Sequence, residues 1–541
     1  MSIFSIFDIG KSALIASQSA LDVTAHNIAN VNTEGYSRQQ IVLQTQPPVK
    51  TRIGYIGRGV LARQVTRSYD SFLQRQIFNQ QQLLSRSDVL ANIYGELEAI
   101  FNEQMQSGFS DAYAEYINAW QAVADNPDSK AERSVLISKT KALIGRAKTI
   151  ERSINTLLSD INKDISNSVD KINSLARQIA TLNEKIAQIE AGNYLQANDL
   201  RDKRDVLMRE LSKYVGYNYY EDTNGMVTII VGRKNLVEGV RYNELGISRN
   251  QDGSINILFG GENINSLLQN GRLEALLTAS EQIRQGAQKA FRRLIAVLIR
   301  NTNLQHKQGF GLDGISGRDF FGGLTVYTED YSAGARISSA NITDYSTVVL
   351  DEYRINFTST TEYEVVDIDS NTVVATGTYT SGATITFNGI SVVIEDDGGT
   401  PQAGDYFIVN PFANSVEDFR LSIAETTEIA AALDASALPG DNRNALQIID
   451  IYRTSVNELN SVISDYYNSI VADVGVLSAA AQDSSKFEST LMEELTSRRE
   501  SLSGVNLDEE AANLIRYQKA FEAAARLIQI TDKLTEEILK L

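Results

Sequence analysis

Apolar residues recur at regular intervals between residues 154 and 189, in the cleanest periodic pattern of the chain. One set is spaced by seven and comprises Leu158, Ile165, Ile172, Ile179 and Ile186. A second set lies between these positions and comprises Ile154, Ile161, Leu175, Leu182 and Ile189, with Ser168 as its polar member. Alternating steps of four and three place both sets on one face of an α-helix. The pattern predicts a long helix whose apolar seam packs along a second long helix.

Both ends of the chain carry a shorter version of this pattern. Near the N-terminus, Leu14, Leu21 and Ile28 are spaced by seven. Near the C-terminus, two interleaved sets have the same spacing, namely Leu507, Leu514, Phe521 and Ile528, and Tyr517, Ala524, Thr531 and Ile538. We therefore expect an amphipathic helix at each end.

The two terminal helices are expected to need a partner. The C-terminal stripe offers about six bulky side chains, each of which contributes roughly 1.5–3 kcal/mol when fully buried. Ordering about thirty-five residues costs on the order of 1–2 kcal/mol per residue before hydrogen bonding is counted, so this helix is marginal alone in water. The N-terminal helix is its nearest candidate partner, and apolar area is expected to remain for other copies. The ends therefore predict a protein that assembles.

A polar turn, "HNIANVNTEGYSRQ", follows the first helix at residues 26–39. The side chains of Asn27, Asn30, Asn32 and Thr33 can bond to backbone donors and acceptors, and Gly35 permits a sharp bend. We interpret this turn as the point at which the chain leaves the terminal helices for the rest of the molecule.

Between the ends, the pattern alternates between helix and strand. Residues 66–215 are expected to be mostly helical, with a break at Pro127. Near residue 215 the period changes, and Asn224-Gly225 and "NQDGS" are hairpin turns of a small β insertion. Helix is expected again from Gly271 to about Asn303. Residues 324–412 have short alternating strands with frequent turns, which is typical of a compact all-β domain.

The predicted fold class is mainly α with inserted β. It combines long terminal coiled-coil helices, a helical body with a small β insertion near 215–262, and a separate all-β outer domain. The expected inner domain is 1–65 plus 505–541. The expected body is 66–323 plus 413–504, and the expected outer domain is 324–412.

Charge and composition restrict the partners. The chain has 50 Lys and Arg against 68 Asp and Glu, a formal net charge of -18, which argues against nucleic acid because phosphate binding needs a basic face. The best local cluster, Arg292, Arg293 and Arg300, lies on an apolar helix and is interpreted as a solvated stripe. The absence of cysteine excludes disulfides and thiolate ligands. We expect no membrane span, because no run reaches ~18 apolar residues, and no cleavable signal peptide, because Lys11 follows the apolar patch.

Known catalytic motifs are matched only superficially. "GFGLDG" at 309–314 follows a predicted helix instead of a strand, so a dinucleotide site is rejected. "DIDSN" at 367–371 lacks the later glycine and glutamate of a calcium loop. His26 and His306 lie far apart in the sequence, without a triad arrangement. We therefore assign no catalytic residue, no cofactor and no metal.

The end motifs resemble a known family. "SALDVTAHNIANVNTEGYSRQ" and "SGVNLDEEAANLIRYQKAFEAAARLI" are similar to the N- and C-terminal signatures of bacterial flagellar axial proteins, the rod, hook and hook-associated subunits. Within that family, "NDLRDKRDVLMRELSKYV", "NTNLQHKQGFGLDGISGRDFF" and "GDNRNALQI" resemble the hook–filament junction members. The resemblance covers nearly the whole chain and is least diagnostic in the β region.

The resemblance implies a structural subunit outside the cell, in a ring of identical copies between the hook and the second junction protein. It also implies export by the flagellar type III apparatus with an uncleaved signal, and a cytoplasmic chaperone on the C-terminal region. The hook protein and the second junction protein would be its neighbours. The expected assembly interface comprises Leu14, Leu21, Asn27, Ile28, Asn30, Asn32, Gly35, Tyr36, Leu507, Leu514, Tyr517, Phe521, Ala524, Ile528 and Ile538.

Three alternatives stay open. The outer β region could carry an enzyme, although residues 324–412 contain no histidine. It could instead be an adhesin, which is compatible with a structural role. The chain could also be a sister axial protein, either the second junction protein or a flagellin.

Overall fold

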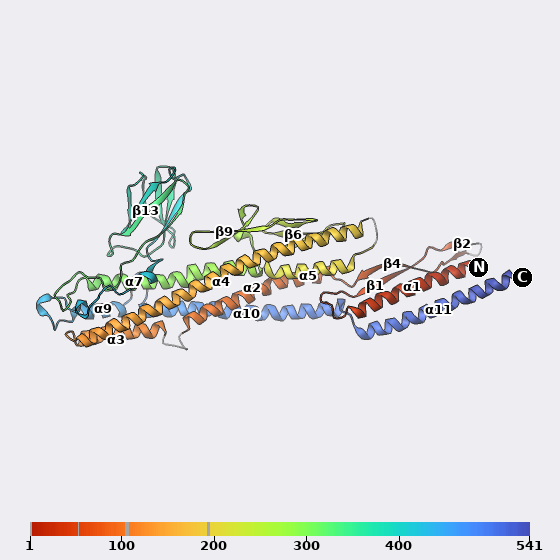
Figure 1. Ribbon diagram of the computed structural model, residues 1–541, viewed down its shortest axis with the longest axis horizontal. Helices are drawn as coiled ribbons and strands as arrows, with labels where there is room; N and C mark the ends of the chain where they lie inside the picture. The colour runs from red at the N-terminus through yellow and green to blue at the C-terminus, as the bar shows by residue number, and fades with distance from the viewer. Residues whose placement is uncertain (1–2, 52–53, 103–107, 192–194, 541) are drawn as a thin grey trace.

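The computed structural model describes residues 3–51, 54–102, 108–191 and 195–540. The molecule is long and narrow (Figure 1). A bundle of helices forms its body, both chain termini lie together at one tip, and a β domain projects from the side of the body near the other end. Within the described residues, no helix is long and apolar enough to cross a membrane.

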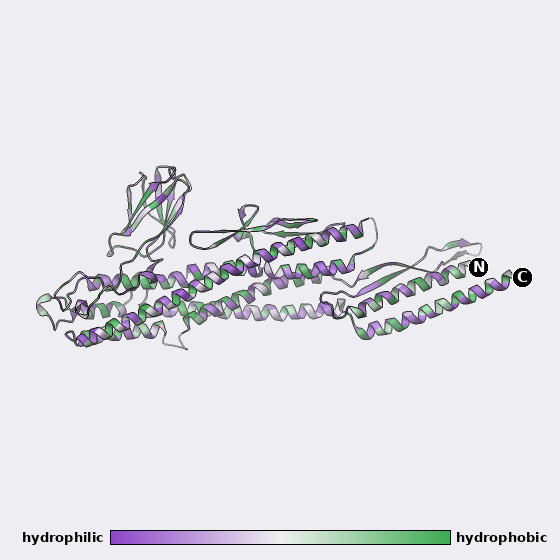
Figure 2. Cartoon of the chain, viewed as in Figure 1, coloured by the Kyte–Doolittle hydropathy of each residue, from purple (hydrophilic) through white to green (hydrophobic). Residues whose placement is uncertain are grey.

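The body consists of long helices that lie side by side. They are α2 (Ser71–Phe101), α3 (Phe109–Asp125), α4 (Lys130–Glu190), α5 (Asn198–Tyr214), α6 (Gly271–Gln282), α7 (Lys289–His306), α9 (Arg443–Arg453) and α10 (Ile463–Ser503). A π-helical segment, Ile283–Gln288, joins α6 to α7. Ser129 caps α4 through a 3.3 Å bond from the Glu132 amide to its hydroxyl, so the helix restarts immediately after the break at Pro127. Polar and apolar residues alternate along each helix (Figure 2), as expected for amphipathic helices around a shared core.

The predicted seam lies within α4 and is mostly buried. Ile154, Ile165, Ile172 and Ile179 are at most 1% exposed, whereas Ile189 is 45% exposed near the end of the helix. The expectation of one long partner helix is wrong. The seam is covered in turn by α3, α2, α6, the strands of the β insertion and α5. A periodic stripe defines which face is apolar, but several short elements can cover such a face together.

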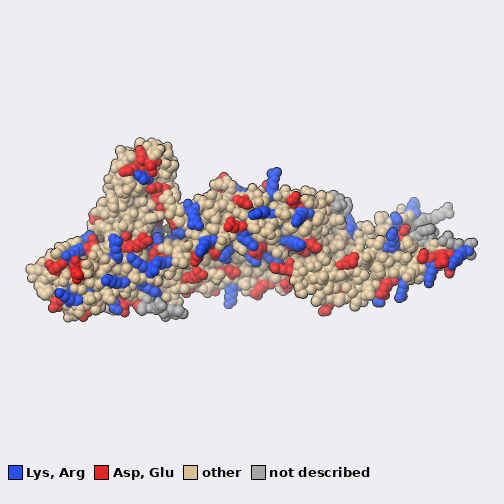
Figure 3. Space-filling model, viewed as in Figure 1, with Lys and Arg blue, Asp and Glu red and all other residues tan. Residues whose placement is uncertain are grey.

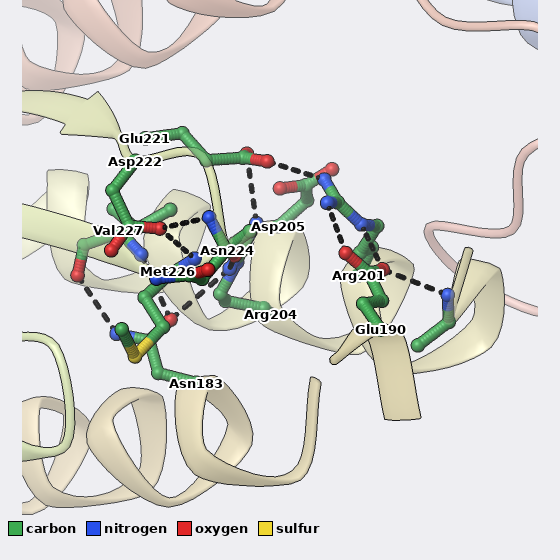
Figure 4. Close-up of polar contacts among 12 residues, drawn as sticks. Asn183, Glu190, Arg201, Arg204, Asp205, Glu221, Asp222, Asn224, Met226 and Val227 are labelled. Carbon is green, nitrogen blue, oxygen red and sulfur yellow. Dashed lines mark hydrogen bonds and ion pairs between the residues drawn. The ribbon is translucent and has the colours of Figure 1, made fainter. Parts of the chain in front are cut away.

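The β insertion packs on α4 and α5 as two small antiparallel sheets. One has the order β5 (Asn218–Glu221), β6 (Val227–Val231), β7 (Lys234–Glu238), β8 (Arg241–Tyr242), and the other β11 (Glu262–Asn263), β10 (Ile255–Phe259), β9 (Leu245–Arg249). Both predicted turns are confirmed, between β5 and β6 and between β9 and β10. Arg204 of α5 and Asn183 of α4 hold the first turn from below (Figure 4).

The outer domain has two antiparallel sheets. The larger has the order β12 (Tyr327–Tyr331), β19 (Tyr406–Asn410), β14 (Tyr353–Phe357), β15 (Glu362–Asp367), β16 (Thr372–Thr378), and the smaller β13 (Ala335–Ile342), β18 (Ile390–Asp396), β17 (Thr384–Phe387). Together with the helical body and the terminal helices, this domain confirms the predicted fold class. Short elements complete the chain: α8 (Ser415–Asp418) and the 3-10 turns Asn265–Leu267, Thr426–Glu428 and Ala435–Ala437.

Helix α7 carries contacts that attach the outer domain to the body. Lys289 lies 3.1 Å from Glu352 and 2.5 Å from Asp369, and Arg293 lies 2.5 Å from Asp351. The expectation of a solvated arginine stripe is therefore wrong. Arg292 pairs with Glu151 and Arg300 with Glu458. Neighbouring elements cover most of α7, so each of these arginines meets a carboxylate, although Arg292 and Arg293 remain 26% and 22% exposed. On the face shown in Figure 3, acidic and basic side chains are interspersed along the body.

Candidate assembly interface

The two terminal helices pack against each other in opposite directions. Helix α1 (Ile3–Ala29) runs from the tip of the molecule toward the body, and α11 (Leu507–Leu539) runs back to the tip (Figure 1). Strands β1 (Gln39–Thr45) and β4 (Val60–Arg67) form a hairpin beside α1. This pair of helices and its hairpin are here called the terminal unit.

Small residues form the most buried side of α1. Ala16, Ala20, Thr24 and Asn27 are at most 3% exposed. A Cβ atom on Gly10 would lie 3.0 Å from Ile528 Cγ1, so the two helices approach closely there. The expected stripe of Leu14, Leu21 and Ile28 is only half-buried. The centre of the buried face therefore differs from the prediction, because close packing against α11 and the hairpin favours small side chains.

Helix α11 presents one row of side chains to α1 and leaves others in solvent. Ala524 is buried, and Leu514, Tyr517, Phe521 and Ile528 are half-buried. Leu527 is also half-buried. Several large apolar side chains of this helix are strongly exposed in the single chain, namely Leu507 at 51%, Ile515 at 59%, Ile530 at 57%, Leu534 at 45% and Ile538 at 57%. The terminal unit thus has a partly covered seam and uncovered apolar surface.

Asn27 joins the end of α1 to the turn that follows. Its amide nitrogen donates to the Gln39 carbonyl at 2.9 Å, and its oxygen accepts from the Gln39 amide at 2.9 Å and the Tyr36 hydroxyl at 2.8 Å. The same nitrogen lies 3.2 Å from Glu510 Oε2 in the first turn of α11. The buried side-chain amide of Asn27 therefore bonds both backbone groups of Gln39, as a residue on a paired strand does. It also links the turn to α11.

Arg38 strengthens the contact between the turn and α11. Its Nε donates to Glu510 Oε1 at 2.7 Å and its Nη1 to Glu509 Oε2 at 2.8 Å. The Glu510 side chain is 2% exposed, so these partners supply the hydrogen bonds that water would otherwise give it. The backbone amide of Arg38 also donates to the carbonyl of Ser503, the last residue of α10, at 2.9 Å. The two chain segments that enter the terminal unit are held together here.

Helix α5 anchors the terminal unit to the body through acids spaced by three. Arg67 Nη1 donates to Asp202 at 2.6 Å and to Asp205 at 2.9 Å, the Ser37 amide donates to Asp202 at 3.0 Å, and Gln39 donates to Asp199 at 2.8 Å. Burial raises the pKa of the Asp202 carboxyl, although the adjacent Arg67 guanidinium acts in the opposite direction. We call this cluster the joint.

The expected turn residues contribute unequally to the joint. Gly35 has a φ of 78°, and a Cβ atom there would lie 2.2 Å from Val206 Cγ2, so both conformation and space require glycine. Burial and the nearby acids Asp199, Asp202 and Glu510 raise the pKa of the Tyr36 hydroxyl, which remains a donor to Asn27. Asn30 caps the end of α1 by donating to the His26 carbonyl at 3.0 Å, whereas Asn32 is exposed.

Sequence reasoning missed the charged half of the joint. Arg38, Arg67, Asp202 and Glu510 were not predicted to form ion pairs, although Asp199, Asp202 and Asp205 share one helix face through their spacing of three. A second signal was the absence of Asp and Glu from residues 35–69, which contain six Lys and Arg. These two signals could have indicated that the basic segment 35–69 contacts the acidic face of residues 199–205.

The two histidines lie in separate environments. His26 is half-exposed, 3.5 Å from Asp199. His306 is fully buried, with Nδ1 2.8 Å from the Arg318 carbonyl and Nε2 2.9 Å from the Ala430 amide. These partners require a neutral ring that donates from Nδ1 and accepts at Nε2. Across the described part of the chain, no group of three or more His, Cys, Asp or Glu is placed to hold a metal ion.

His306 is expected to make the body less stable in mild acid. Burial lowers the pKa of its imidazole to about 4, below about 6.5 in an unfolded chain. The unfolded state therefore binds the proton first as pH falls, and the free energy of unfolding should drop by about 3 kcal/mol between pH 7 and pH 4 from this group. The only tryptophan, Trp120, lies 6.5 Å from the His306 ring, so its fluorescence in denaturant should report this change.

The matched variant for this test is His306→Gln, which can offer one donor and one acceptor but does not titrate. We expect the variant to be less stable at pH 7 and its deficit to shrink by about 3 kcal/mol toward pH 4. Parallel pH curves for the two proteins would contradict this account of His306.

Family models match most of the chain. The model described as flagellar hook-associated protein FlgK helical domain matches residues 94–321, and the one described as flagellar hook-associated protein 1, D2-like domain, matches 328–411. The flagella basal body rod protein model matches residues 7–36, and the flagellar basal body rod FlgEFG protein C-terminal model matches 498–541. The last two matches fall on the terminal unit and its entry into the body.

Individual relatives agree with these matches over the full length. Flagellar hook-associated protein 1 of Salmonella typhimurium is 29% identical, with 99% of this chain and 100% of the relative covered. The protein of the same name from Bacillus subtilis is 26% identical, with 99% and 98% covered. The structure of the flagellar hook junction protein FlgK from Burkholderia pseudomallei is 19% identical and has a TM-score of 0.67 over 79% of this chain and 100% of that one, which shows a shared fold.

Proposed function

Because the chain belongs to the flagellar hook-associated protein 1 family, we propose that it is a structural subunit of the bacterial flagellum at the junction of hook and filament. In this role identical copies form a ring, and the hook protein and the second junction protein are the neighbours. The role of the chain in this proposal is structural and involves no substrate or cofactor.

The observation that carries this proposal is the terminal unit. The hydrogen bonds and ion pairs of the joint attach its two helices to the body. In α11, however, the side chains of Ile515, Ile530 and Ile538 are more than half exposed. Exposed apolar rows of this kind are covered when subunits associate. The terminal unit also coincides with the rod-protein family matches at residues 7–36 and 498–541.

We assign the predicted interface residues two tasks. The apolar residues of α1 and α11 form the seam and the surface that meets neighbouring copies, and they are Leu14, Leu21, Ile28, Leu507, Leu514, Tyr517, Phe521, Ala524, Ile528 and Ile538. The turn residues Asn27, Asn30, Gly35 and Tyr36 hold the terminal unit at a defined angle to the body, while Asn32 is free to meet a neighbour. An inner domain of 1–65 plus 505–541, a body of 66–323 plus 413–504 and an outer domain of 324–412 fit this division of labour.

Export is part of the proposal. The chain would leave the cytoplasm through the flagellar type III apparatus, with an uncleaved N-terminal signal and a chaperone on the C-terminal region. The exposed apolar side chains of α11 form a surface to which such a chaperone would bind before assembly. The lack of cysteine suits a chain that travels unfolded, because it cannot crosslink on the way.

Deletion of the gene tests the proposal directly. We expect cells that make hooks without filaments, with flagellin lost to the medium, and recovery when the intact gene is restored. Electron microscopy of the cells and analysis of the medium would show both effects. Normal filaments in the deletion strain would contradict a role at the junction.

A further inference from the structure

A hollow of about 600 Å³ lies beside the joint. The turn at residues 26–36, α4 and α5 form its walls. Leu182, Val206 and Leu207 supply apolar surface, and Glu34 and Asp199 supply two carboxylates against one lysine, Lys203. Asp202 also reaches the wall, but its carboxylate is paired with Arg67. The hollow is therefore apolar inside and acidic overall. We call it the joint hollow.

A feature of opposite character lies at the far end of the terminal unit. Strands β2 (Val49–Thr51) and β3 (Gly54–Ile56) pair beyond the β1–β4 hairpin and form a narrow arm. Tyr55 is 72% exposed, the highest value among the exposed large apolar side chains of the described residues, and Val49 is 48% exposed. Lys50 and Arg58 are exposed beside them. Residues 46–59, which include the arm, contain three Lys and Arg and no acid in a chain of net charge -18.

We infer that the arm of one copy binds in the joint hollow of a second copy. The tyrosine ring and its apolar neighbours match the apolar walls, and the basic arm matches the acidic rim. A buried tyrosine removes roughly 150–250 Å² from water, and a hollow of about 600 Å³ has room for it. Opposite charges at the rim orient the two parts and speed their encounter.

The arm of a chain cannot fill the hollow of the same chain. Gln39 lies at the joint, and the chain leads away from it along the terminal unit through β1 and then β2 (Figure 1). At about 3.3 Å per residue, the twelve steps from Gln39 to Thr51 span up to about 40 Å. The contact is therefore made between copies, and it joins two different surfaces. Such head-to-tail contacts repeat from copy to copy and build rings or helical arrays.

This inference rests on the proposed function and names a contact within that assembly. Because the chain has no cysteine, a pair of introduced cysteines reports it cleanly. Tyr55→Cys places one thiol on the arm, and Thr181→Cys places one at the wall of the joint hollow. Mild oxidation of flagella sheared from cells that carry the double variant should give a ladder at multiples of the chain mass. The matched control combines Thr181→Cys with Val373→Cys, which is 54% exposed on the outer domain.

We expect the Tyr55→Cys pair to give at least about ten times more ladder than the control pair. Arg58→Glu should weaken the ladder about fivefold, and Glu34→Lys added to it should restore the ladder by reversing both charges. A ladder no stronger than that of the control, or a product that contains a different flagellar protein, overturns the inference while leaving the proposed function intact. Normal filaments in the deletion strain would instead remove the proposed function.

Discussion

A chain without residues 1–29 and 507–541 is expected to fold its body but not to restore swimming. The main apolar core runs from Phe78 to Ala481 and, among the described residues, includes none from α1 or α11. The two helices pack mainly on each other and on β1 and β4. Their loss should therefore leave the unfolding transition of the body unchanged, as measured by circular dichroism. Swimming in soft agar should fall to the level of the deletion strain.

Truncation also removes any export signal in the ends, so a second variant separates assembly from export. Phe521→Asp keeps both ends and places a charge on the half-buried row that faces α1. Burial of an unpaired carboxylate is strongly unfavourable, so this variant should be exported, accumulate in the medium and fail to restore filaments. Leu507→Asp, at a side chain that is 51% exposed, shows whether the uncovered surface also matters. Swimming by cells with the truncated chain would refute the role of the terminal helices.

The periodicity of the sequence predicted the helices and strands of this fold better than it predicted which elements pack against each other. The stripe in α4 was correctly predicted because five heptads of Ile and Leu leave little ambiguity. What covers it was not predictable, since the face is shared between α3 and α5, which adjoin α4 in the sequence, and α2, α6 and strands of the β insertion. The hairpin turns at Asn224-Gly225 and Asp252-Gly253 were readable locally because glycine there adopts a positive φ of 76° and 78°.

The terminal seam shows where hydrophobic patterns mislead. Pattern reasoning gives weight to large residues and selected Leu14, Leu21 and Ile28. The structure buries Ala16 and Ala20 more deeply, because a close helix crossing has room for small side chains only. Glycine and alanine carry little weight in such a pattern, so a stripe of small residues beside a stripe of leucine is easily overlooked.

The polar turn of the joint was predicted, but the ion pairs that hold the joint together were not. The asparagine-rich turn indicated local bonding, and Asn27 does close it. The ion pairs from Arg67 to Asp202 and from Arg38 to Glu510 link positions more than a hundred residues apart. A single sequence gives each charge but not its partner.

Replacement of Arg204 with methionine is expected to destabilise the β insertion by about 3–5 kcal/mol, the usual cost of breaking a buried charged network. Its side chain is 1% exposed. Nη1 donates to the Gly225 carbonyl at 2.5 Å and to Asn183 Oδ1 at 3.1 Å, and Nη2 donates to Glu221 at 3.1 Å (Figure 4). Methionine fills much of the volume but supplies none of these donors, so the Gly225 carbonyl loses a charged partner inside the protein.

The effect should be local, because Arg204 holds the β5–β6 turn against α4 and α5. Asn183 still accepts from the Val227 amide at 3.1 Å and donates to the Val227 carbonyl at 2.8 Å, so the sheet should remain attached but open more often. Hydrogen exchange of residues 218–238 should accelerate by about a hundredfold or more, since each 1.36 kcal/mol corresponds to a factor of ten. Arg204→Lys should recover only part of the loss, because an ammonium cannot reproduce the planar fork. The control is Arg241→Met at an exposed position of β8, and equal exchange in the two methionine variants would show that the buried guanidinium does not hold the turn.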